Sequence, residues 1–584
     1  MIQINFSRNI LLGVIFIIGT FCIPNCFVSR HITTGILCIA ISLIPCITIC
    51  PIETIKVTRL SLYVLLFATL WGVHQVCHSV LGWLDWIENI SFLLLFFILS
   101  QQEFNRRKLV KLYFLGSIAT VVMEIWGLLQ LLGVVPAYNM FFPITGSFEN
   151  PTGLAIFSST LLPCSLYFTL EKNVKYKIWG CISSFFGILV ILLTHSRTGI
   201  LITFILCMIY LFQNKSSLLN YILKCKYLFI GVIFLLLVGI YFWKKDSADG
   251  RILIWLCSLD MFNEHYFLGI GSGRFQAEYM LYQAEFFDQY PNSTFTMLAD
   301  NTRHPFNEYL KILVEYGMLG FSLVGLIFFN IVKVYTLHKN NRSLFPVFGC
   351  ILSIMLAACT SYPLNYPSII FIGVLSAAII NSYQVIIWEI NKKIKIKQMI
   401  NVITLFLFFY LCFVCWYGLL EYKWNKMTQY FFHGKVEKVL SQYEKIYTWM
   451  KRDGLFLYNY GVILNQERKY HESIKMLHEC CLYFNDFDVQ MLLAQNYIHI
   501  GAYKNAEQHL ILASKMCPVR FLPLYKLMNL YSKMQKNDKA NYYAQIIINK
   551  PVKVNSLQVI KIKKAAKILL ENNSRYEKCI SYPL

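Results

Sequence analysis

Apolar runs separated by short polar segments recur along roughly the first 420 residues of the chain. Their lengths lie near the 17 to 25 residues that an α-helix needs to cross the hydrocarbon core of a bilayer. Unbroken runs, rather than alternation of apolar and polar positions, favour helices over a membrane barrel. The pattern predicts about 12 to 13 spans: 9–26, 33–50, 59–78, 82–100, 109–133, 151–170, 177–194, 198–213, 227–243, 309–332, 344–361, 367–388 and 399–420.

Composition agrees with this pattern, because 57% of the 584 residues are hydrophobic, more than a soluble core of this size needs. We therefore expect an all-α fold, a polytopic helical membrane protein. Residues 1–420 form the predicted transmembrane domain, residues 244–308 a long loop within it, and residues 425–584 a polar C-terminal domain.

Basic residues alternate between the predicted loops. Twenty of them lie in one set of loops, whereas the opposite short loops hold only Arg30 and Arg197. Since Lys and Arg in short loops resist translocation, the N-terminus is expected in the cytoplasm, and loop 244–308 and the chain after Glu421 on the outer side. The net charge of +22 thus reflects topology, and no nucleic-acid partner is predicted.

The C-terminal domain has an internal period of 33 residues. Gly461, Leu464, Tyr470, Ser473, Leu477 and Cys480 recur as Ala494, Tyr497, Tyr503, Ala506, Leu510 and Ala513, and a degenerate third unit carries Tyr531 and Ala540. This period resembles the tetratricopeptide repeat, in which small residues let paired helices approach. A generic domain of helical hairpins is the alternative. A repeat array offers a concave surface to a protein partner.

Charged side chains gather at the predicted outer surface. "THSRTGIL" places Arg197 at the end of a span, and "GRILIWLCSLDMF" places Arg251 at the start of an amphipathic stretch expected to lie as a helix in the headgroup plane. In "RHPFNEYL", Pro305 predicts a helix that begins just after His304, with His304 near the cap and on one face with Asn307 or Glu308. The alternatives are an arginine that snorkels to the interface and a purely capping histidine.

Two further features of loop 244–308 have structural alternatives. Gly269, Gly271 and Gly273 predict a tight turn, since no βαβ context supports a dinucleotide site. A set of aromatic residues could stack on sugar rings or pack the loop onto the membrane domain: Tyr279, Tyr282, Phe286, Phe287 and Tyr290.

The ordered set "GSFENPTGLA", "HSRTGIL", "RILIWLCSLDMF…LGIGSGRF" and "HPFNEYLKILVEYGMLG" resembles the O-antigen ligase and polymerase superfamily, which includes bacterial protein O-oligosaccharyltransferases. The resemblance covers roughly residues 60–390. It implies a bacterial inner-membrane enzyme that transfers glycan from an undecaprenyl diphosphate-linked donor to a lipid A-core or protein acceptor on the periplasmic side. It also implies inversion at the anomeric carbon, no cofactor and no metal. The repeats would recruit a protein partner in the periplasm.

Residue by residue, the resemblance implies that Arg197, Arg251 and His304 are catalytic. A guanidinium binds a departing diphosphate bidentately without a metal, and a histidine takes or orients the proton of the acceptor hydroxyl. Pro305 and Phe306 separate His304 from Asn307, so either of these two holds the position of the family's histidine. The predicted substrate-binding residues are Asn150, Arg274, Arg303, Asn307 and Glu308.

Other functions remain open on sequence alone. A polymerase that joins repeat units shares every one of these motifs. A lipid or glycan transporter predicts ionisable groups at mid-span and broken helices in paired halves. A non-catalytic membrane scaffold leaves the outer arginines without a purpose.

Overall fold

The computed structural model describes residues 29–47, 54–78, 82–137, 139, 141–213, 239, 245–390, 393–434 and 436–580. Five helices in these ranges are long and apolar enough to cross a membrane. They are α3 (Arg59–His78), α5 (Arg106–Leu131), α7 (Val174–Leu193), α13 (Glu308–Leu337) and α16 (Lys393–Phe432). The protein is therefore an all-α polytopic membrane protein, as the apolar runs predict.

Shorter apolar helices complete the described part of the bundle. They are α2 (His31–Ile47), α4 (Trp83–Leu99), α6 (Pro151–Phe168), α8 (Arg197–Gln213), α14 (Phe345–Ala358) and α15 (Pro367–Asn381). Helix α6 lies at the centre, since every residue from Gly153 to Phe168 is buried. The predicted spans 9–26 and 227–243 lie outside the described residues.

One predicted span ends early. The span expected over 367–388 stops at Asn381, and the apolar run that follows forms β2 (Ile386–Ile390). This strand pairs antiparallel with β1 (Ile55–Thr58) in a two-stranded sheet. A short apolar run reads alike as strand or helix, so periodicity alone misses this strand.

The connections gather at the two ends of the bundle as the basic-residue alternation predicts. At one end Lys56 lies 3.2 Å from Glu103 and Arg106 lies 3.4 Å from Glu171, next to the β1–β2 pair. At the other end Arg30 donates to the carbonyl of Ser147. Which end faces the cytoplasm stays a prediction.

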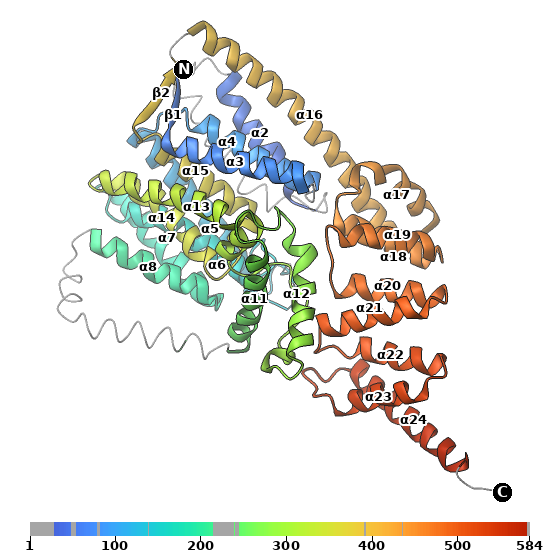
Figure 1. Ribbon diagram of the computed structural model, residues 1–584. Helices are drawn as coiled ribbons and strands as arrows, with labels where there is room; N and C mark the ends of the chain where they lie inside the picture. Colours follow the sequence, from blue (N-terminus) through green and yellow to red (C-terminus); the bar gives the residue numbers. More distant parts are fainter. Residues whose placement is uncertain are drawn as a thin grey trace.

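Loop 244–308 contains two helices, α11 (Lys245–Glu264) and α12 (Phe275–Gln289), and a 3₁₀ turn, η1 (Thr294–Met297). Gly269, Gly271 and Gly273 all have positive φ, which confirms the predicted turn between α11 and α12. In Figure 1 both helices stand between the bundle and the C-terminal domain.

The C-terminal domain is a stack of helix pairs (Figure 1), in which Gly461 lies so close to Leu477 that a Cβ there would meet its side chain at 2.8 Å. Ala494, Ala506 and Ala513, which follow the 33-residue period, are fully buried. The predicted boundary at 420–425 falls inside α16, which continues to Phe432. The helices are α17 (Val436–Met450), α18 (Gly454–Gln466), α19 (Tyr470–Cys481), α20 (Phe487–His499), α21 (Tyr503–Met516), α22 (Leu522–Lys533), α23 (Asn537–Asn549) and α24 (Leu557–Ile580).

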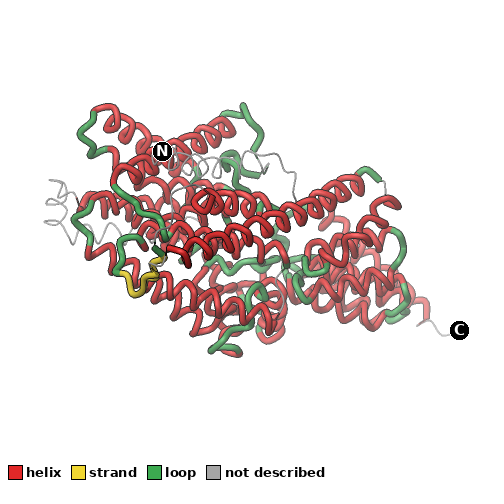
Figure 2. Tube along the Cα trace, turned by 90° about the horizontal axis from the view of Figure 1, so that it is seen from above, coloured by secondary structure: helices red, strands yellow, loops and turns green. Residues whose placement is uncertain are grey.

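The C-terminal stack packs directly on loop 244–308, at the end of the bundle away from the two strands (Figure 2). The side-chain amide of Gln283 on α12 donates to the carbonyl of Met516 at 2.6 Å. Lys515 lies 2.7 Å from Asp288, and Arg520 lies 2.7 Å from Asp300. The stack and the loop therefore lie at the same end of the bundle.

Candidate active site

Tyr362, just before the short turn η3 (Pro363–Asn365), contacts two of the predicted site residues, His304 and Asn150. Its ring lies 5.1 Å from the imidazole of His304 and 5.3 Å from the ring of Phe306, measured between centroids. Its hydroxyl accepts a hydrogen bond of 2.9 Å from the amide of Asn150. These contacts join the α6 N-terminus, the end of the long loop and the α14–α15 connection.

Asn150 has two roles at this point. Its Oδ1 accepts from the backbone N–H of Gly153 and caps α6, while its Nδ2 donates to the hydroxyls of Tyr362 and Tyr366 at 2.9 and 3.1 Å. An Asn cap satisfies one of the four free N–H groups of a helix start. The cap therefore fixes the direction in which the amide reaches the site.

The two predicted arginines lie side by side. Arg197, the first residue of α8, donates to Oγ of Ser247 at 3.2 Å, and Ser247 lies one turn before Arg251 on the same face of α11. The guanidinium of Arg251 lies 5.3 Å from the centre of the Phe306 ring. Burial, together with the positive charge of Arg197, lowers the pKa of Arg251 to about 10. The neighbouring positive charges of Arg197 and Arg251 therefore favour binding of an anion.

Arg251 sits differently from the sequence-based expectation. It was expected at the start of its helix, but α11 begins at Lys245, so Arg251 lies in the second turn. The apolar face predicted to lie in the headgroup plane is the outer face of α11, where Ile252, Leu256 and Leu259 are exposed.

His304 lies outside any helix, against the prediction of a cap. Asn307 is the N-cap of α13, accepting from the N–H of Leu310 at 3.1 Å, and Phe306 has a left-handed φ of 54°. The chain thus reverses between His304 and Asn307, and the two share no helical face. The prediction failed because Pro305 starts a turn here and not the helix.

The imidazole of His304 is held by a neutral partner. Nδ2 of Asn365 lies 2.9 Å from its Nε2 and donates to an unprotonated ring nitrogen. Burial, with Lys311 and Arg303 nearby, lowers the pKa of His304 to about 3. The ring is therefore neutral at physiological pH, and its one unprotonated nitrogen accepts from Asn365.

The structure does not bring the remaining predicted residues to Tyr362 in the same way. Arg274 pairs with Glu278 on its own helix at 3.6 Å, and Arg303 turns to the C-terminal domain, 4.0 Å from Asp486. Asn307 is engaged as a cap. Glu308 is buried in the first turn of α13, directly after that cap.

Most of the aromatic residues of loop 244–308 pack against neighbouring side chains and do not face the site. Tyr279 and Phe287 are buried in the core shared with the C-terminal stack, and Tyr282 donates to Glu264. Tyr290 is 57% exposed. For these aromatic residues the structure therefore favours packing over stacking on sugar rings.

Sequence reasoning missed Tyr362, Asn365 and Ser247. Tyr362 and Asn365 belong to "SYPLNYP", a polar and aromatic stretch with two prolines between apolar spans. Such a stretch at the outer end of a bundle was the available signal, since loops on a rigid scaffold carry function. In the described part of the chain no three His, Cys, Asp or Glu side chains lie close enough to hold a metal ion.

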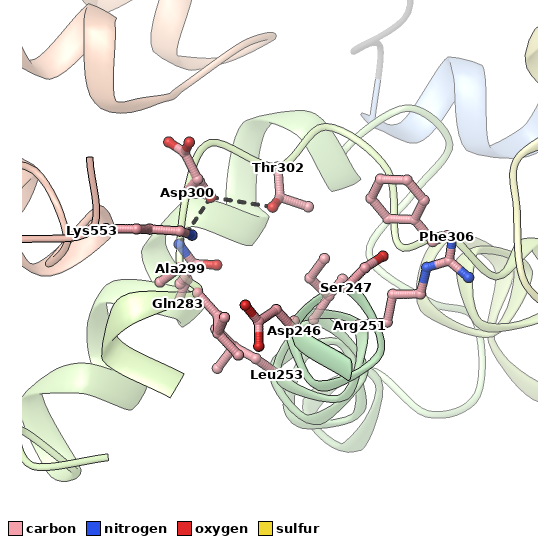
Figure 3. A pocket seen from close by; sticks show the side chains of 13 residues that line it. Asp246, Ser247, Arg251, Leu253, Gln283, Ala299, Asp300, Thr302, Phe306 and Lys553 are labelled. Atoms are coloured by element: carbon pink, nitrogen blue, oxygen red, sulfur yellow. Dashed lines mark hydrogen bonds between the residues drawn. The ribbon is translucent and has the colours of Figure 1, made fainter. Parts of the chain in front are cut away.

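A cavity of about 320 Å³ opens beside Arg251 (Figure 3). Its walls are the first turns of α11, the segment Leu298–Thr302 and the ring of Phe306. Lys553 of the C-terminal domain lies at the end opposite Arg251.

Fold and site together define a polytopic helical membrane protein with a cationic and aromatic site at one end of its bundle. Residues 182–325 match the family described as O-antigen ligase. The match includes Arg197, Arg251 and His304 and confirms the resemblance drawn from the motifs.

None of the curated proteins matches the chain. A solved structure, "Crystal structure of APC/C hetero-tetramer Cut9-Hcn1", is similar over 82% of this chain and 76% of that chain, with 10% identity and a TM-score of 0.22. A TM-score this low carries no argument about fold or function.

Proposed function

We propose that this protein transfers a glycan from an undecaprenyl diphosphate carrier to an acceptor hydroxyl on the periplasmic face of a bacterial inner membrane. The observation that supports it most is that Arg197 lies next to Arg251, while Arg251 and His304 both lie against the Phe306–Tyr362 ring pair, inside or beside the segment that matches the ligase family. The predicted acceptor is lipid A-core or a protein.

The arginines suit a diphosphate leaving group. Two adjacent guanidinium groups repel each other, and an anion between them removes that repulsion. Because Arg251 has no ion-pair partner among the residues that the structure describes, its charge is available to the substrate. Bidentate donation to phosphate oxygens stabilises the charge that develops as the glycosidic bond to the carrier breaks.

His304 suits the acceptor side of the reaction. Burial and nearby cations keep it neutral, so a sugar or protein hydroxyl that displaces the amide of Asn365 can donate to the unprotonated ring nitrogen. A bound diphosphate offsets the positive charge around the ring and raises its proton affinity as the hydroxyl attacks. The acceptor oxygen then attacks the anomeric carbon, the bond to the diphosphate breaks, and the configuration inverts.

Deletion of the gene in its host, with complementation by wild type or Arg251→Ala, tests this function. Surface polysaccharide and glycoprotein profiles are compared. Intact polymer left on its carrier indicates a ligase, whereas short units in place of long chains indicate a polymerase of the same family. Unchanged profiles in the deletion strain contradict both.

A further inference from the structure

The cavity beside Arg251 is built by two parts of the chain that are far apart in sequence. Asp246, Ser247 and Arg251 come from one side of α11, and Asp300 and Thr302 from the end of the long loop. The opposite end is closed by Lys553, which lies between α23 and α24 in the C-terminal domain (Figure 3).

The segment that carries Lys553 is held in place by a series of hydrogen bonds. Nζ of Lys550 donates to the carbonyl of Arg520 at 2.9 Å, and the guanidinium of Arg520 donates to Asp300 at 2.7 and 3.1 Å. Nζ of Lys563 donates to the carbonyl of Lys550 at 2.8 Å. Since Asp300 is itself a cavity wall, the position of Lys553 relative to the cavity is set by direct contacts.

The lining has the chemistry of a sugar-binding site. Asp246 and Lys553 have no hydrogen-bond or ion-pair partner in the ranges that the structure describes, so one acceptor and one donor face the cavity unused. The hydroxyls of Ser247 and Thr302 can donate or accept, and Phe306 offers an apolar ring. Sugars present vicinal hydroxyls and an apolar ring face to such groups.

We propose that this cavity binds one saccharide unit of the transferred substrate, and that Lys553 of the C-terminal domain donates a hydrogen bond to that unit. The inference rests on the proposed function, because Arg251 belongs both to this cavity and to the diphosphate site. It gives the C-terminal domain a direct part in substrate binding, beyond recruitment of a partner. A sugar that carries a carboxylate binds more tightly than a neutral one, since Lys553 is cationic.

The test uses the full-length protein in membranes of its host, with the photo-reactive residue p-benzoylphenylalanine in place of Lys553. The matched control carries the same residue in place of Lys567, which is exposed on α24 away from the cavity. After irradiation, mass spectrometry of the digested protein detects sugar attached at either position. We expect sugar at position 553 and none at position 567.

A second strain, unable to load the first sugar phosphate onto undecaprenyl phosphate, separates the two sources of the saccharide. Loss of the adduct in that strain assigns the sugar to the donor, and persistence assigns it to the acceptor. Normal glycan transfer without an adduct at 553, or equal adducts at 553 and 567, overturns the inference while the proposed function stands. An adduct at 553 alone, together with a wild-type protein that transfers no glycan, supports the cavity and contradicts the proposed function.

Discussion

Gly317 interrupts α13 where the backbone of Phe267 lies against it. A Cβ at Gly317 would lie 2.3 Å from the carbonyl oxygen of Phe267, and Gly317 has a φ of 62°. The interruption leaves backbone groups of α13 without helical partners, and the loop supplies them. Ile270 donates to the carbonyl of Val314 at 2.9 Å, and Met318 donates to the carbonyl of Tyr266 at 2.9 Å. The loop that carries Arg251 is thereby fixed to a membrane helix.

Replacement of Gly317 by alanine is expected to destabilise this junction strongly. The left-handed backbone and the collision with Phe267 together cost about 2 to 5 kcal/mol. The melting temperature of the purified protein in detergent measures it. Gly325→Ala on the same helix is the control, because a Cβ there meets nothing within 4 Å. Equal melting temperatures for the two variants would contradict the described break in α13.

Arg251→Ala is expected to reduce glycan transfer by about 100-fold or more, the usual cost of removing a group that stabilises charge in the transition state. Arg251→Lys keeps the charge but loses bidentate donation, so most of the loss should remain. Arg274→Ala is the matched control, because Arg274 pairs with Glu278 on its own helix. Transfer is measured in membranes as glycan released from the carrier. Full activity of Arg251→Lys would rule out bidentate binding.

His304 predicts a specific dependence of stability on pH. Its pKa is lowered to about 3 in the folded protein from an ordinary value of 6.5. The unfolded chain therefore takes up a proton below pH 6.5 that the folded chain does not, and the contribution of the neutral ring is lost as pH falls toward 3. Between pH 7 and pH 5 the melting temperature of His304→Gln should fall less than that of wild type. Parallel curves for both proteins argue against a neutral, buried ring.

The sequence carried enough information for the helices of the bundle and for the helix pairs of the C-terminal domain. Apolar length predicts spans such as 109–133, found as α5, because a bilayer demands that length. The 33-residue period predicts the close approach of helices at Gly461 and Ala494, because small residues are required where helices touch.

The site could be predicted only in part. Arg197, Arg251 and His304 stand out as polar residues next to apolar runs, but Tyr362, which contacts His304 and the Phe306 ring beside Arg251, is 58 residues beyond His304 in the chain. Its role depends on how α14 and α15 pack. Arg303 likewise points toward Asp486 in the C-terminal domain. These two residues come together only because that domain packs on loop 244–308. Long-range contacts of this kind leave no local pattern.

The contact between Asp300 and Arg520 predicts a link between glycan transfer and the packing of the C-terminal domain on loop 244–308. Both side chains are partly exposed, so their coupling in a double-mutant cycle should reach only about 0.2 to 1 kcal/mol of stability. Because Asp300 also forms a wall of the cavity, Asp300→Ala is expected to lower transfer severalfold. Asp288→Ala removes the pair with Lys515 at the same interface but away from the cavity, so transfer should change little. If both variants reduce transfer equally, the effect belongs to docking as a whole and not to the cavity wall.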